Sequence, residues 1–160
     1  NPVPPPVMQD IEEYFQDHLK QVEKTFDLEN PLRKLKIFME YHFYQYLNEK
    51  EFLLVFLNLI QLNRRFYQSR AYDSLKSYWR VLEKLVQEAI DDGKASTQFN
   101  IRLFRNMFLG AFTHMALRWF VTEPLQKIDK VSEIQNVTQM FIDVIVNSCN
   151  WNGSQDRTAL

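Results

Sequence analysis

Three histidines are the residues best suited to hold a metal ion in this sequence. His18, His42 and His114 lie far apart along the chain, and no Cys, Asp or Glu recurs near them at a ligand spacing. The Glu-x-x-His pair that builds a di-iron centre in ferritin-like bundles is also missing from the sequence. We therefore expect neither a metal site nor a cofactor.

The remaining reactive residues do not form a catalytic pattern. Asp91 and Asp92 precede Gly93, which is typical of a solvated helix end, and Gly93-Lys94 lacks the other glycines of a phosphate-binding loop. Cys149 has no histidine in register to activate its thiol. We expect that this chain is not an enzyme.

Composition narrows the class of protein further. The 160 residues are 46% hydrophobic and 14% aromatic with a formal net charge of −1, which predicts one folded domain without a nucleic-acid-binding surface. A single cysteine fits a reducing compartment, and no signal peptide opens the chain. The longest uncharged runs, 52–63 and 106–117, are too short to span a bilayer. The expectation is a cytoplasmic protein.

The hydrophobic spacing predicts helices and no strands. Four of the six prolines lie in residues 1–6, which we expect to be an extended lead-in to a domain at 7–149, followed by a flexible tail at 150–160. Apolar residues three or four positions apart predict an all-α bundle of six helices at 7–24, 31–46, 51–66, 69–92, 97–121 and 132–148. Predicted capping residues are Asn30, Gly93, Ser96 and Ser132, the last in a capping box with Gln135.

The fifth helix carries two apolar stripes, about 100° apart on a helical wheel. One reading is an ordinary core, and the other is that one stripe lines a core or cavity while the second meets another subunit. Gly110 and Ala111 favour a subunit contact, because small residues let two backbones approach closely. With the last helix as companion, a two-fold axis would give a four-helix interface.

The order of these signals resembles the regulatory domain of TetR-family transcriptional repressors. The resemblance lies in Asn30-Pro31-Leu32 with Leu35, in Glu49-Lys50-Glu51-Phe52, and in the helix that ends at Ala89-Ile90-Asp91-Asp92-Gly93-Lys94. It is strongest in residues 99–120, with Gly110 near the middle and Trp119 at the end.

The resemblance implies a homodimer that binds a small effector and releases operator DNA. The family's DNA contact is an N-terminal helix-turn-helix, which this chain does not contain, so operator binding would need a part outside it. On this reading the first helix links the regulatory body to the DNA-binding part, and the last two helices form the dimer.

Within the TetR-like arrangement, the geometry of the apolar stripes predicts the residues of the effector pocket and of the dimer interface. The expected effector is largely apolar, either an acyl chain or a flat aromatic compound, and Arg64, Arg65, Arg102 and Arg105 are candidates to meet an acid group. The predicted pocket residues are Phe38, Tyr41, His42, Phe56, Phe66, Trp79, Phe104, Phe108 and Phe112. The predicted dimer residues are Met107, Gly110, His114, Leu117, Val121, Ile134, Val137, Phe141, Val144 and Ile145. Two alternatives are a cytosolic carrier of apolar ligands and a structural helical dimer or adaptor with a filled core.

Overall fold

The computed structural model describes residues 5–24, 30–122 and 127–153, and these ranges contain helices but no strand. The elements are α1 (Pro5–Glu23), α2 (Pro31–Asn48), α3 (Lys50–Val55), the π-helical turn η1 (Phe56–Ile60), the short 3-10 helix η2 (Phe66–Gln68), α4 (Arg70–Asp91), α5 (Ile101–Thr122), α6 (Lys130–Asn147) and the 3-10 helix η3 (Ser148–Gly153). The all-α, six-helix prediction is confirmed.

Several helix ends form where the sequence predicts them. The Asn30 side chain accepts a hydrogen bond from the Leu32 amide at 3.1 Å, and Pro31 occupies the first helical position, where no amide hydrogen is needed. Ser69 caps α4 in the same way. Gly93 follows α4 with φ of 71°, a left-handed conformation that glycine adopts without strain.

Other helix ends differ from the prediction. α1 begins at Pro5, inside the segment expected to be extended, because a proline in the first turn loses no helical hydrogen bond. α5 begins at Ile101 after Asn100, whose side chain accepts from the Leu103 amide at 2.9 Å. Asp129 caps α6 by accepting from the Ser132 amide at 3.1 Å, so the predicted capping box does not form. Residues 1–4 of the predicted lead-in and residues 154–160 of the predicted tail lie outside the described ranges.

The helix predicted at 51–66 is divided into three pieces. α3 ends at Val55, and the Gln61 amide then donates to the Phe56 carbonyl at 2.8 Å, a π-type bond across five residues. The Asn58 side chain donates to the Leu54 carbonyl at 2.8 Å, which competes with the regular helical bond. Hydrophobic periodicity carries no sign of a side-chain hydrogen bond to the backbone, so it predicts one continuous helix at 51–66.

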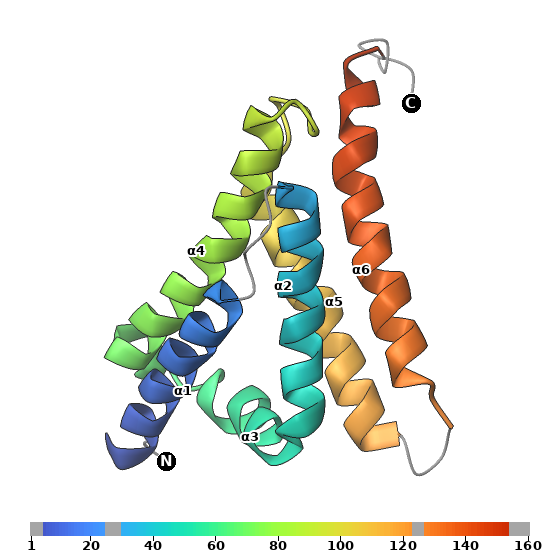
Figure 1. Cartoon of the computed structure of the whole chain (residues 1–160). Helices are drawn as coiled ribbons and strands as arrows, with labels where there is room; N and C mark the ends of the chain where they lie inside the picture. The colour runs from blue at the N-terminus through green and yellow to red at the C-terminus, as the bar shows by residue number, and fades with distance from the viewer. Residues whose placement is uncertain (1–4, 25–29, 123–126, 154–160) are drawn as a thin grey trace, which may run out of the picture.

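α2 lies at the centre of the bundle (Figure 1). It packs on α4 at one side and on α6 at the other, while α1 packs on α4. The Trp119 indole nitrogen donates to Glu133 at 2.6 Å and Arg118 pairs with the same carboxylate, so α5 and α6 are fastened to each other.

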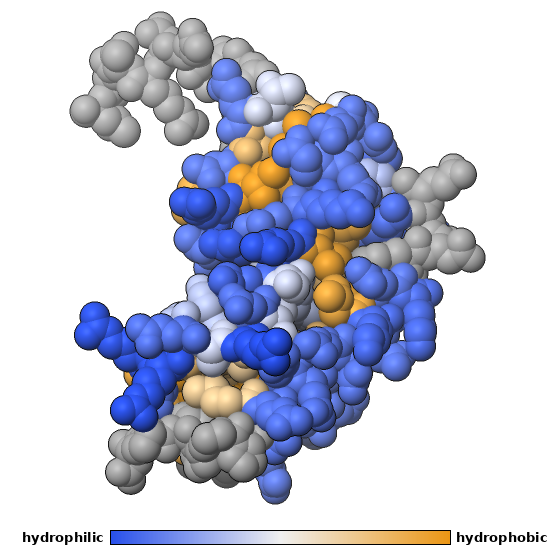
Figure 2. All heavy atoms as spheres, turned by 90° about the vertical axis from the view of Figure 1, so that its left-hand side faces the viewer, coloured by the Kyte–Doolittle hydropathy of each residue, from blue (hydrophilic) through white to orange (hydrophobic). Residues whose placement is uncertain are grey.

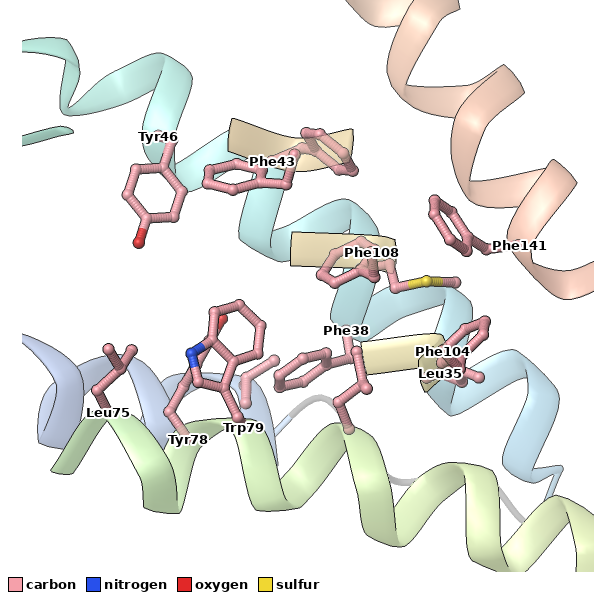
Figure 3. Close-up of a cluster of buried hydrophobic side chains, with 14 of the residues drawn as sticks. Leu35, Phe38, Phe43, Tyr46, Leu75, Tyr78, Trp79, Phe104, Phe108 and Phe141 are labelled. Carbon is pink, nitrogen blue, oxygen red and sulfur yellow. The ribbon is translucent and has the colours of Figure 1, made fainter. Parts of the chain in front are cut away.

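The core is built largely from aromatic rings. Phe38, Phe43 and Phe108 are fully buried, and Phe108 meets Phe141 of α6 edge to face with 5.5 Å between the ring centroids. Figure 3 shows how these rings from several helices gather around α2. The side of the molecule that carries α1 and α4 is mainly hydrophilic, with strips of apolar surface between the polar side chains (Figure 2). No described helix is both long and apolar enough to cross a membrane.

Candidate functional site

A cavity of about 110 Å³ lies where the end of α2, the segment 56–67, the start of α4 and the middle of α5 meet. Tyr46, Leu75 and Trp79 face one another around part of this space (Figure 3). The lining residues are Tyr46, Phe56, Leu57, Gln61, Phe66, Tyr67, Leu75, Trp79, Leu109, Phe112 and Thr113. The space is partly open at the surface and is large enough to hold several water molecules.

One wall of the cavity is the irregular segment between α3 and α4. Phe56 and Phe66 are buried and in edge-to-face contact, with ring centroids 5.6 Å apart. The Tyr67 hydroxyl donates to the Gln61 carbonyl at 2.8 Å and thereby holds the π-turn against η2. This wall is therefore held by buried aromatic contacts and a few local hydrogen bonds, without a continuous helix.

The lining chemistry suits an apolar ligand with a small polar part. Most lining side chains are aromatic or aliphatic, and the polar Gln61, Tyr67 and Thr113 are partly or largely exposed at the rim. Ligand pockets commonly combine such apolar walls with a few orienting hydrogen-bonding groups. Among the described residues no group of three or more His, Cys, Asp or Glu is placed to hold a metal ion.

A buried polar pair lies directly behind the cavity. His42 Nδ1 is 3.1 Å from the Tyr78 hydroxyl, and both side chains are almost completely buried. Burial, with a smaller effect from His18, lowers the pKa of His42 well below its ordinary value of 6.5. Burial likewise raises the pKa of Tyr78 and of Tyr46, so all three side chains are neutral at pH 7.

The predicted pocket residues divide into two groups. Phe56, Phe66, Trp79 and Phe112 line the cavity. Those that do not line it are Phe38, His42, Phe104 and Phe108, which are buried in the core, and Tyr41, which is half-buried and turned toward His18 of α1.

The cavity residues that sequence reasoning missed have two origins. Leu57, Gln61 and Tyr67 enter the lining through the π-turn and η2, for which the sequence offers no periodic signal. Leu109 and Thr113, four residues apart on α5, lie on a third side of the helix, outside both predicted stripes. Of the predicted arginines, Arg64, Arg65 and Arg102 are exposed, and Arg105 pairs with Glu83 at 2.6 Å.

The predicted dimer residues also divide. Met107, Gly110, His114 and Val144 are exposed, and Leu117 and Val137 are half-buried. In contrast, Ile134, Phe141 and Ile145 are buried within this chain, where they fasten α6 to the core, and are not available to a partner. The side chain of Val121 lies outside the described residues. Leu103 and Met140, 54% and 66% exposed, belong to the same apolar face but were not predicted.

Comparison with known proteins identifies relatives of this arrangement. Residues 10–144 match the family described as YsiA-like protein, C-terminal region. The fatty acid degradation regulator FadR from Bacillus halodurans superposes with a TM-score of 0.73 at 19% identity, covering 85% of this chain and 70% of that one. The transcriptional regulator FadR from Bacillus subtilis, solved in complex with stearoyl-CoA, gives 0.71 at 21% identity, covering 88% and 73%. No curated protein sequence matches the chain significantly.

Proposed function

The chain belongs to the family of YsiA-like C-terminal regions, the regulatory domains of TetR-type transcriptional regulators, and from this premise we propose that it binds an acyl compound whose chain enters the cavity between α2, α4 and α5. The observation that carries this proposal is the cavity itself. Its lining is mostly aromatic and aliphatic, and the polar Gln61, Tyr67 and Thr113 are partly or largely exposed, which suits an acyl chain inserted with its head group outward. That the Bacillus subtilis regulator is described with stearoyl-CoA adds support.

Membership of a regulator family favours a regulatory role over a carrier or an enzyme. A regulator that acts on operator DNA works in the cytoplasm, which is where we place this protein.

Ligand binding in the cavity would be transmitted to the DNA-binding part by a movement of α1. Phe56 of the cavity wall contacts Phe15 of α1, with 5.7 Å between the ring centroids, and Phe15 also contacts Tyr78 of α4. Tyr14 of α1 stacks on Phe52 of α3 at 3.9 Å. A ligand that displaces the segment 56–67 would therefore move α1, which in the TetR family leads to the DNA-binding helices. Effector and operator affinities would then be coupled.

Binding is tested by titrating dodecanoyl-CoA into the full chain and measuring the affinity by calorimetry. Replacing Thr113 by Trp should fill the cavity and lower the affinity at least tenfold. The matched control is Arg33→Trp at an exposed position of α2, which should bind like the wild type. Equal affinity in all three proteins would exclude this cavity as the site.

We further propose that the chain forms a homodimer through the apolar face of α5 and α6. Leu103, Met107, Met140 and Val144 are exposed on these two helices. At Gly110 an added Cβ would meet no atom of this chain within 4 Å, so the space beside it is open to a second backbone. An apolar face of this kind, exposed on the single chain, is typical of the surfaces that two subunits bury against each other in a two-fold dimer.

Gly110→Glu tests this interface by sedimentation velocity. The single chain has room for the side chain, and glutamate favours a helix more than glycine does, so the protein should stay folded. A buried charge at the seam should shift the sample to monomers, whereas Gly110→Ala should remain dimeric. A Gly110→Glu protein that sediments as a full dimer would place the interface elsewhere.

A further inference from the structure

The His42 side chain has one ring nitrogen without a partner in the middle of the core. The residue is 2% exposed, and its Nδ1 atom lies 3.1 Å from the Tyr78 hydroxyl. Its Nε2 atom is buried and has no hydrogen-bond partner among the described residues. A buried polar atom left unpaired costs free energy, so an unpaired group in a native core calls for an explanation.

His42 lies close to the cavity, behind the rings that line it. Its ring lies 4.6 Å from the ring of Tyr46, 4.8 Å from that of Trp79 and 4.2 Å from that of Phe112, between ring centroids. All three rings line the cavity, so a single layer of aromatic side chains separates it from His42. Contact between a ligand and the imidazole therefore requires Phe112 or Tyr46 to change its side-chain rotamer.

The hydrogen bond to Tyr78 determines which kind of group Nε2 presents. His42 is the one hydrogen-bond partner that the described residues offer to the buried Tyr78 hydroxyl. That hydroxyl hydrogen therefore points to Nδ1, and the single hydrogen of the neutral imidazole is on Nε2. The unpaired group is thus a donor for which the described residues supply no acceptor.

We infer that His42 is a specificity-determining residue, and that the ligand of this cavity carries a neutral oxygen, a hydroxyl or a carbonyl, at its buried end. Nε2–H would donate to that oxygen. A carboxylate is a poor candidate, because a negative charge buried beside a neutral imidazole without a cation would be strongly disfavoured. The inference rests on the proposed function and adds to it: the preferred acyl chain is oxygenated at the end remote from its head group, which stays at the polar rim.

The experiment compares two probes by calorimetry, dodecanoyl-CoA and 12-hydroxydodecanoyl-CoA, on the full chain. The wild type should bind the hydroxylated probe about tenfold more tightly, the upper range of what one neutral hydrogen bond contributes. His42→Phe should abolish this preference while it retains binding of dodecanoyl-CoA. His42→Gln, which keeps an amide donor, should recover part of the preference.

Tyr41→Phe is the matched control, because it removes a hydroxyl from the neighbouring position on α2 without changing the cavity lining. It should keep the full tenfold preference. Equal affinity of the wild type for both probes, or a preference that persists in His42→Phe, would overturn the inference and leave the proposed acyl site standing. If the wild type binds neither probe, the proposed function itself fails.

Discussion

Two regions of this domain have similar apolar composition but very different packing. In the aromatic core around Phe43, Phe108 and Trp119, regular helices bury every one of these rings completely or nearly so. In the cavity wall, residues 56–68, the backbone changes from a π-turn to a 3-10 helix, and Leu59 and Leu62 are 64% and 79% exposed.

The cavity wall is the region of the domain that a ligand can displace most easily. Close-packed rings on regular helices move only at a high cost in free energy, because each displaced side chain leaves a void. The cavity wall is held by local hydrogen bonds, such as that from the Tyr67 hydroxyl to the Gln61 carbonyl, and already borders a void. Segments that lack a continuous helix open at lower free energy than the regular helices of the core.

The largest expected effect is the loss in free energy of unfolding when a buried ring is truncated, and it should differ between the two regions. Phe108→Ala, which truncates a fully buried ring, should lower the free energy of unfolding by about 3–5 kcal/mol. Phe66→Ala in the cavity wall should cost clearly less, because the lost side chain borders existing space. Urea denaturation of both variants measures the difference, and equal losses would show that the two regions are packed alike.

A pH titration examines His42, which contacts both regions through the rings of Phe108 and Phe112. Because burial keeps His42 unprotonated when folded, below pH 6.5 the unfolded chain binds a proton that the native state does not. The contribution of His42 is therefore complete above pH 6.5. It falls with decreasing pH by up to about 1.4 kcal/mol per unit.

The measurement is the free energy of unfolding between pH 7 and pH 5, for the wild type and for His42→Phe. The wild type should lose stability more steeply than the variant across this window. Parallel curves would mean that His42 takes up a proton in the folded state.

A third prediction concerns the junction between the two regions. Ser69 ends η2 and caps α4 by accepting from the Tyr72 amide at 3.3 Å. Ser69→Ala should therefore destabilise the protein by about 1 kcal/mol. Thermal unfolding detects this loss, and Ser69→Asp, which restores a capping oxygen, should recover most of it.

The smallest effect is expected on the outer side of the cavity wall. Leu62 is 79% exposed, so Leu62→Gln should change the free energy of unfolding by less than about 0.5 kcal/mol. Urea denaturation of this variant gives the value. A larger loss would reveal that Leu62 is covered, by a partner or by a rearranged wall.

Much of the domain was determined by sequence alone, because its signals are local. Apolar spacing predicted the helices, Asn30 and Gly93 marked two of their ends, and the order of these elements indicated the TetR family. Capping was less certain where several polar residues compete: Asn100 and Asp129 cap α5 and α6 in place of Ser96 and Ser132.

The candidate site was decided by tertiary structure. The sequence supplied Phe56, Phe66, Trp79 and Phe112 as large apolar residues, but it did not distinguish them from Phe38, Phe104 and Phe108, which pack in the core. Which ring borders the void depends on how α2, α4, α5 and the segment 56–67 come together in space. Helical periodicity records which face of a helix is apolar, whereas a cavity is a property of the space between helices.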